Sequence, residues 1–160
     1  MKVFGGSPLN EISSASSETS LKLLSQEMLD ELLKRGQDTD VQESLNGLSI
    51  RLVTVATDCP GKEDRQCNLV IKDGKITKAE ARIRPAPSEL RDSLLDKSQL
   101  DAKVISPFKP LTDIVQGKIS LISAFEHIKI EGDLPKLMIQ VEGFVAFLKF
   151  IGSMPVNWKI

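Results

Sequence analysis

Residues 66–84 read QCNLVIKDGKITKAEARIR, and this stretch sets the architecture of the chain. Apolar and polar side chains alternate on both sides of Asp73-Gly74, as expected for strands with one buried face. Asp-Gly favours the tight turn of a β-hairpin, because glycine tolerates a positive φ. The stretch therefore predicts two antiparallel strands joined by a short turn, the second of which ends near Arg84.

The sequence before this hairpin predicts a third strand and a helix. Leu48, Ile50 and Leu52 alternate with polar residues, and residues 58–61 read DCPG, which is typical of a turn. Between residues 21 and 35, leucines and a methionine recur at spacings of three and four, which predicts an amphipathic helix. The three strands together form an antiparallel meander that follows this helix.

After the hairpin, helices and strands alternate. Ser88 can cap a short helix that extends to about Leu95. Pro110 suits the first turn of another helix, which Gly117 can end. The remaining predicted elements are a strand at 101–106, a helical segment at 119–125 and a strand at 128–130.

Residues 134–151 predict a final helix whose apolar arc is wide. One apolar row is flanked by further apolar side chains, while polar residues are few. A helix packed on one side needs an apolar arc of only about 100°. Either this helix is buried on most sides, or part of it contacts something other than the protein. The row consists of Leu137, Val141, Phe144, Leu148 and Ile151.

Composition narrows the classes of function. The 160 residues include 21 Lys and Arg against 22 Asp and Glu, a balance that argues against nucleic acid as the main partner. No apolar run reaches the roughly 18 residues that span a bilayer. Residues 1–20 are rich in serine and low in apolar side chains, so we predict a flexible leader there. The remainder, 21–160, is predicted to be a single cytoplasmic domain.

Neither a metal site nor a catalytic site is predicted. Cys59 and Cys67 have no neighbouring histidine or further cysteine, so we expect two unpaired thiols and no metal. His127 is the only histidine, and no nucleophile or orienting carboxylate accompanies it in a known motif. We therefore expect no enzyme and no cofactor.

Three segments, in this order, resemble the sterol carrier protein 2 family. Residues 106–118 read SPFKPLTDIVQGK, a short strand and then a helix ending in Gly-Lys. Ala124-Phe125 follows, and residues 128–134 read IKIEGDL, similar to the family's lysine-containing closing strand and Gly-Asp turn. The resemblance covers residues 45–148. The chain departs from the family in its long segment 85–100, and its last residues are not a peroxisomal signal of the Ser-Lys-Leu type.

The resemblance implies an α+β fold, with a five-stranded, mostly antiparallel sheet, helices on one face and an apolar tunnel between the layers. It implies binding of a long-chain lipid (fatty acid, acyl-CoA, sterol or isoprenoid) and transfer between membranes, with transient contact at a membrane surface. Which lipid is bound, and the oligomeric state, stay open. The residues implied to contact lipid are Ile114, Val115, Ile122, Phe125, Met138, Val141, Phe144, Val145 and Leu148.

A second hypothesis comes from another functional class. The apolar C-terminal helix could dock an enzyme or a complex, which would make the domain an accessory module. A sealed interior together with a large exposed apolar patch would favour this alternative. An open apolar space under the helix would favour lipid binding.

Overall fold

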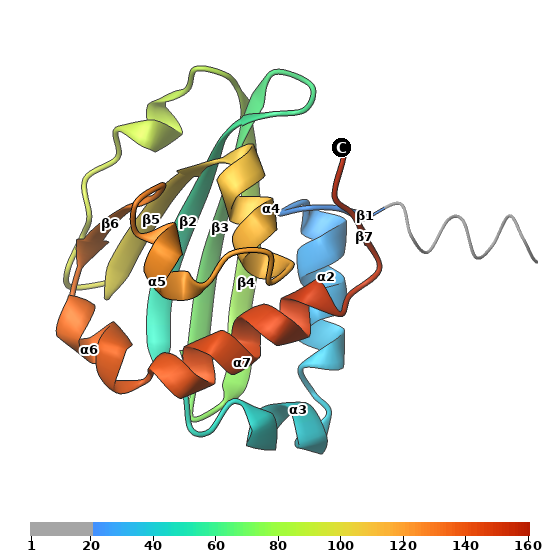
Figure 1. The fold of residues 1–160 in the computed structure, drawn as a ribbon, viewed down its shortest axis with the longest axis vertical. Helices are drawn as coiled ribbons and strands as arrows, with labels where there is room; N and C mark the ends of the chain where they lie inside the picture. The colour runs from blue at the N-terminus through green and yellow to red at the C-terminus, as the bar shows by residue number, and fades with distance from the viewer. Residues whose placement is uncertain (1–20) are drawn as a thin grey trace, which may run out of the picture.

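The computed structural model describes residues 21–160, so the leader predicted at residues 1–20 lies outside the described residues. Figure 1 shows the elements along the chain. They are β1 (Leu21–Lys22), α2 (Gln26–Arg35), α3 (Thr39–Ser44), β2 (Ile50–Cys59), β3 (Glu63–Lys72), β4 (Lys75–Pro85), the 3₁₀ turn η1 (Glu89–Arg91), β5 (Ala102–Pro107), α4 (Phe108–Val115), α5 (Leu121–Ala124), β6 (Lys129–Gly132), α6 (Leu134–Ile139), α7 (Val141–Gly152) and β7 (Val156–Asn157).

The main sheet has five strands in the order β4-β3-β2-β5-β6. Three of its pairs are antiparallel, and β2 and β5 are parallel. The predicted α+β class and the five-stranded, mostly antiparallel sheet are therefore confirmed, although the sheet is mixed. A second, two-stranded parallel sheet joins β1 to β7.

The predicted meander is formed by β2, β3 and β4. Asp73 and Gly74 have φ values of 50° and 79°, the left-handed conformation that a two-residue hairpin turn requires. The first helix begins later than predicted. Leu21 lies in β1, and Ser25 caps α2 by accepting a hydrogen bond from the backbone N–H of Met28.

The final helix, predicted as one element over 134–151, is divided into α6 and α7. The break is at Gln140, which has φ −106° and ψ 22°. Its side-chain amide donates to the carbonyl oxygen of Ser49 at 2.9 Å and accepts from the Ser49 N–H at 2.7 Å. These two bonds hold Gln140 against the chain just before β2, which explains why the helix changes direction there.

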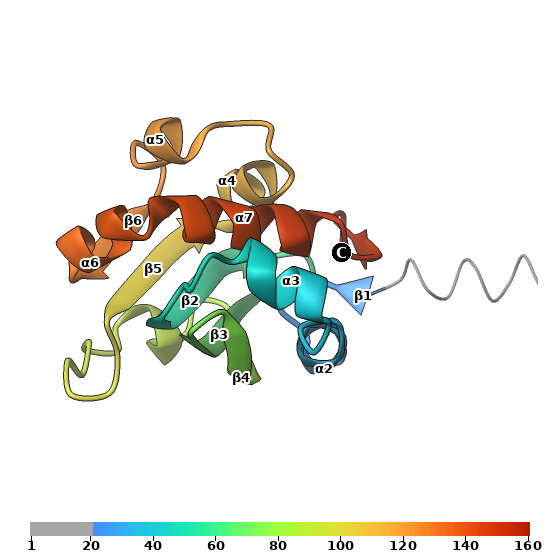
Figure 2. The same cartoon turned by 90° about the horizontal axis from the view of Figure 1, so that it is seen from below.

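Helices cover one face of the sheet, as Figure 2 shows. On this face α4 and α7 cross over the strands, and α2 packs beside β4. The opposite face is crossed by residues 86–101, which we call the strap. The strap contains η1, and its Leu90 is fully buried. The sheet therefore has two covered faces over part of its area, where the sequence predicted one.

The short helix predicted from Ser88 to about Leu95 is also shorter than expected. Ser88 does cap it, but only one 3₁₀ turn forms, and Leu94 beyond it is 95% exposed. The ammonium group of Lys103 lies 2.5 Å from the carbonyl oxygen of Ser93 and 3.4 Å from that of Leu90. In a continued helix the carbonyl groups of Leu90 and Ser93 would accept from N–H groups of the helix itself. Their contacts with Lys103 therefore favour an irregular strap.

Within residues 21–160, no helix is long and apolar enough to cross a membrane.

Candidate functional site

A small inner cavity of about 80 Å³ lies between the sheet and its covering helices. The strands supply alternate residues, because successive side chains point to opposite faces of a sheet. The helices supply residues spaced three or four apart, which share one helix face. Apart from Thr54 and Cys67, every residue of the wall is aliphatic, aromatic or methionine. The wall consists of Leu23, Leu24, Met28, Leu29, Leu32, Leu52, Thr54, Cys67, Leu69, Val104, Leu111, Ile114, Val115, Leu121, Ile128, Ile130, Leu137, Phe144, Phe147, Leu148 and Ile151.

A larger outer groove, of about 740 Å³, lies between the end of α4, the α5 segment and the helices α6 and α7. Ser120 caps α5 by accepting from the N–H of Ser123, and Gly117 turns the chain after α4 with φ 75°. These turns position the α5 segment opposite α7. The groove is lined by Ile114, Val115, Gln116, Gly117, Ile119, Ser120, Leu121, Ile122, Phe125, Met138, Val141, Val145, Leu148, Lys149, Gly152 and Ser153.

The structure places eight of the nine sequence-predicted residues around this groove. Phe144 is the exception, because it points inward and contributes to the inner cavity. Three of the eight contribute to both spaces. Whether any of the nine contacts lipid stays a prediction. The eight are Ile114, Val115, Ile122, Phe125, Met138, Val141, Val145 and Leu148.

The sequence reasoning missed the inner half of the site. Leu52, Thr54 and Leu69 on the strands, together with Leu29 and Leu32 on α2, surround the inner cavity. Their periodicity identified a buried face but not a space behind it. An ordinary core and a cavity wall produce the same apolar pattern, so no signal in the sequence separates them.

The two spaces are neighbours, and the single tunnel that we expected stays a prediction. Four residues belong to both walls, namely Ile114, Val115, Leu121 and Leu148. The inner cavity is smaller than the roughly 150 Å³ that admits a benzene molecule. The outer groove falls within the roughly 300–1,000 Å³ range typical of small-molecule sites. The four shared residues place the groove directly beside the cavity.

Large apolar side chains are exposed on α5 and α6, and two of them, Ile122 and Met138, line the groove. Ile122 on α5 is 76% exposed, and Ile139 at the end of α6 is 85% exposed. Leu134 and Met138 on α6 are 42% and 46% exposed. Large exposed aliphatic groups that cluster on one surface are typical of sites that contact a ligand, a membrane or a partner.

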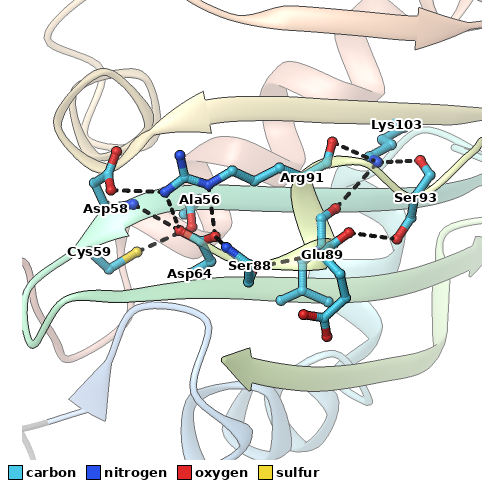
Figure 3. A network of polar contacts seen from close by, with 10 residues as sticks. Ala56, Asp58, Cys59, Asp64, Ser88, Glu89, Arg91, Ser93 and Lys103 are labelled. Carbon is cyan, nitrogen blue, oxygen red and sulfur yellow. Dashed lines mark hydrogen bonds and ion pairs between the residues drawn. The ribbon is translucent and has the colours of Figure 1, made fainter. Parts of the chain in front are cut away.

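A polar cluster holds the strap against the opposite face of the sheet (Figure 3). The guanidinium of Arg91 donates two hydrogen bonds to the carboxylate of Asp64, each 2.8 Å long. Ser88 donates to the same carboxylate at 2.6 Å through its hydroxyl. Arg91, then Ser88 and the N–H of Asp58, hold the pKa of the fully buried Asp64 well below its usual range. An ionised carboxylate with so many donors is a structural anchor and a poor general base.

The same strap covers Lys103 of β5, which is only 2% exposed. Burial lowers the pKa of Lys103. Its ammonium group faces backbone carbonyls of the strap, and the closest is that of Ser93. The cluster and Lys103 thus attach the strap at two points. Among the described residues, no group of three or more His, Cys, Asp or Glu is arranged to hold a metal ion.

We expect both thiols to be unreactive in the folded protein. Burial raises the pKa of Cys59 to about 11 and that of Cys67 to about 12, so neither forms a thiolate at neutral pH. A thiol reagent at pH 8 should label fewer than about one in ten molecules before unfolding, and both cysteines after it. Rapid labelling of native protein would show that one thiol is accessible.

Solved structures share this arrangement of sheet and helices. The crystal structure of sterol carrier protein 2 matches it with a TM-score of 0.63 over 83% of this chain and 99% of that chain, at 11% identity. The chain has the sterol carrier protein 2 fold. The solution structure of a conserved hypothetical protein from Thermus thermophilus, whose description refers to sterol carrier protein, matches with a TM-score of 0.57, 11% identity, and coverage of 85% and 94%.

The sterol carrier protein 2 fold is established here by three-dimensional similarity alone. No family model matches the sequence, and no curated protein matches it either. The structural matches confirm the fold that the order of the segments in the sequence had suggested.

Proposed function

We propose that residues 21–160 form one domain that binds a long-chain lipid without covalent chemistry. The outer groove supports this proposal most directly, because it is large, mostly apolar and shares four wall residues with an apolar cavity. The name of the neighbouring structure, sterol carrier protein 2, points to the same ligand class. The nine predicted residues are proposed to contact the lipid, and the inner cavity is proposed to receive one end of it.

The hydrophobic effect would provide the affinity. Each buried methylene contributes about 0.8 kcal/mol, so ten methylenes provide about 8 kcal/mol before the costs of association are subtracted. The exposed side chains of Ile122 and Met138, which line the groove, would contact a membrane surface while the lipid enters or leaves. Transfer between membranes and a cytoplasmic location complete the proposal.

The accessory-module hypothesis is kept because two observations favour it. The inner cavity is small, at about 80 Å³, and α6 exposes the large apolar side chains of Leu134, Met138 and Ile139. A partner protein could dock on α6 without any lipid. The two functions differ in one respect that can be measured, namely whether the groove binds a free lipid.

Blocking the groove tests the proposal. Val145→Phe and Met138→Trp should lower the affinity for a fluorescent fatty acid at least tenfold, equivalent to about 1.4 kcal/mol. The larger side chains occupy open space, so the melting temperature without ligand should change little. Leu94→Trp, on the strap and away from the groove, is the matched control and should bind as the wild type does.

The opposite result has a clear meaning. If Val145 and Met138 belong to close-packed core, overpacking should cost roughly 1–3 kcal/mol of stability. Three results together would favour the accessory module. They are this loss of stability, no binding of a fatty acid by the wild type, and no lipid detected by mass spectrometry in an organic extract of the purified protein.

A further inference from the structure

One hydroxyl group lies in the wall of the inner cavity. Thr54 is in the middle of β2, where its cross-strand neighbours are Cys67 on β3 and Val104 on β5. All three line the cavity on the side of the sheet that the helices cover. The other wall residues, Cys67 aside, offer only hydrocarbon side chains or the thioether of Met28. Thr54 therefore carries the only side-chain oxygen in this wall.

This hydroxyl has no hydrogen-bond partner within residues 21–160. Every fully buried side-chain nitrogen or oxygen among those residues does have a partner. The oxygen of Thr54 is therefore not completely buried, and Thr54 itself lines the cavity. Thr112, on the same side of the protein, shows the usual alternative, because its hydroxyl donates to the carbonyl of Lys109 at 2.8 Å. Valine has the shape of threonine without the hydroxyl, so an apolar wall alone would favour valine at position 54.

We propose that Thr54 is the polar anchor at the inner end of the lipid site, where it bonds an uncharged oxygen of the ligand. This inference rests on the proposed lipid binding. A hydroxyl can both donate to and accept from a ligand hydroxyl, and it can donate to a carbonyl. In an apolar cavity such a bond discriminates strongly, because a polar group left without a partner is unfavourable there.

The charge of the wall decides the class of ligand. No lysine, arginine or histidine lines the inner cavity. An ionised carboxylate or phosphate at its inner end would be buried without a counter-ion, which is strongly unfavourable. A long-chain alcohol or another neutral lipid with one terminal oxygen avoids this cost. The site thus selects a neutral oxygen-bearing lipid over a fatty-acid anion at its inner end.

The test compares the wild type with Thr54→Val and Thr54→Ser. Displacement of an apolar fluorescent probe measures the affinity of each protein for 1-hexadecanol and for hexadecane. Thr54→Val should bind hexadecanol about five- to tenfold more weakly, equivalent to about 1–1.4 kcal/mol, and hexadecane as the wild type does. Thr54→Ser, which keeps the hydroxyl, should retain most of the affinity for hexadecanol. The melting temperature of unliganded Thr54→Val should be unchanged or higher.

Contrary outcomes are equally specific. An unchanged affinity of Thr54→Val for hexadecanol would overturn the role of Thr54 and leave lipid binding intact. An equal loss for hexadecanol and hexadecane would show an effect of shape and would also overturn it. A loss of hexadecanoate affinity in Thr54→Val as large as the loss for hexadecanol would overturn the neutral class, because it would place the carboxylate at the inner end. No binding of any of the three by the wild type would overturn both the inference and the proposed function.

Discussion

Replacing Arg91 by alanine is expected to destabilise the protein by about 3–5 kcal/mol at neutral pH. Asp64 is fully buried, and both of its carboxylate oxygens accept from the Arg91 guanidinium. The substitution leaves that carboxylate buried without its main counter-charge, although Ser88 and the N–H of Asp58 remain. Chemical denaturation followed by circular dichroism would measure the loss. Arg82→Ala, an exposed arginine of β4, is the control and should change stability by less than about 0.5 kcal/mol.

The effect of Arg91→Ala should depend on pH. The guanidinium, more than any other group, holds the pKa of Asp64 below its usual range. A lowered pKa in the folded state stabilises the protein above the unfolded value of about 3.9, and this stabilisation is lost as pH falls toward the folded value. Without Arg91 the pKa of Asp64 rises. The difference in stability between wild type and variant should therefore be full at neutral pH and become smaller below about pH 4.

A double mutant separates this pair from other effects of truncation. Asp64→Asn removes the charge while it keeps a hydrogen-bond acceptor. Because the two side chains contact each other directly, Asp64→Asn combined with Arg91→Ala should cost less than the sum of the single substitutions. Additive costs, or a pH-independent effect of Arg91→Ala, would show that the ion pair does not anchor the strap.

Gly143→Ala on α7 should lower stability by about 1–3 kcal/mol. An added Cβ would lie 2.5 Å from the carbonyl oxygen of Leu45 and 3.1 Å from the Cβ of Leu48. The backbone of α7 therefore approaches the chain before β2 as closely as glycine permits. The carbonyl belongs to the backbone and cannot rotate away, so the helix must move. Thermal denaturation with Glu142→Ala, the exposed neighbour, as the control would measure the loss.

The sign of this prediction separates packing from helix propensity. In an exposed helix, replacing glycine by alanine stabilises by about 1 kcal/mol. A stabilised Gly143→Ala variant would mean that α7 does not lie so close to Leu45. Displacement of α7 would also move Phe144 and Phe147, which line the inner cavity. Lipid affinity is therefore expected to fall in this variant together with stability.

Local patterns in the chain were sufficient to predict the meander and the order of the elements. Alternating apolar residues around Asp73-Gly74 specify a hairpin because the period of a strand and the φ of its turn are local properties. Leu137, Val141 and Leu148 could be assigned to one row of the final helix for the same reason, since helical spacing is local. The order of the segments from residue 106 to residue 134 was enough to suggest the fold.

Features that depend on distant partners became visible only in three dimensions. The final helix breaks at Gln140, because its side-chain amide forms two hydrogen bonds with the backbone of Ser49, which is far away in the sequence. Lys103 looks like a solvent-facing lysine in its strand, yet the strap buries it. Thr54 differs from an ordinary strand threonine only through the cavity beside it. Such contacts join residues far apart in the chain, and a local pattern carries no information about which distant group will satisfy a polar atom or leave a space empty.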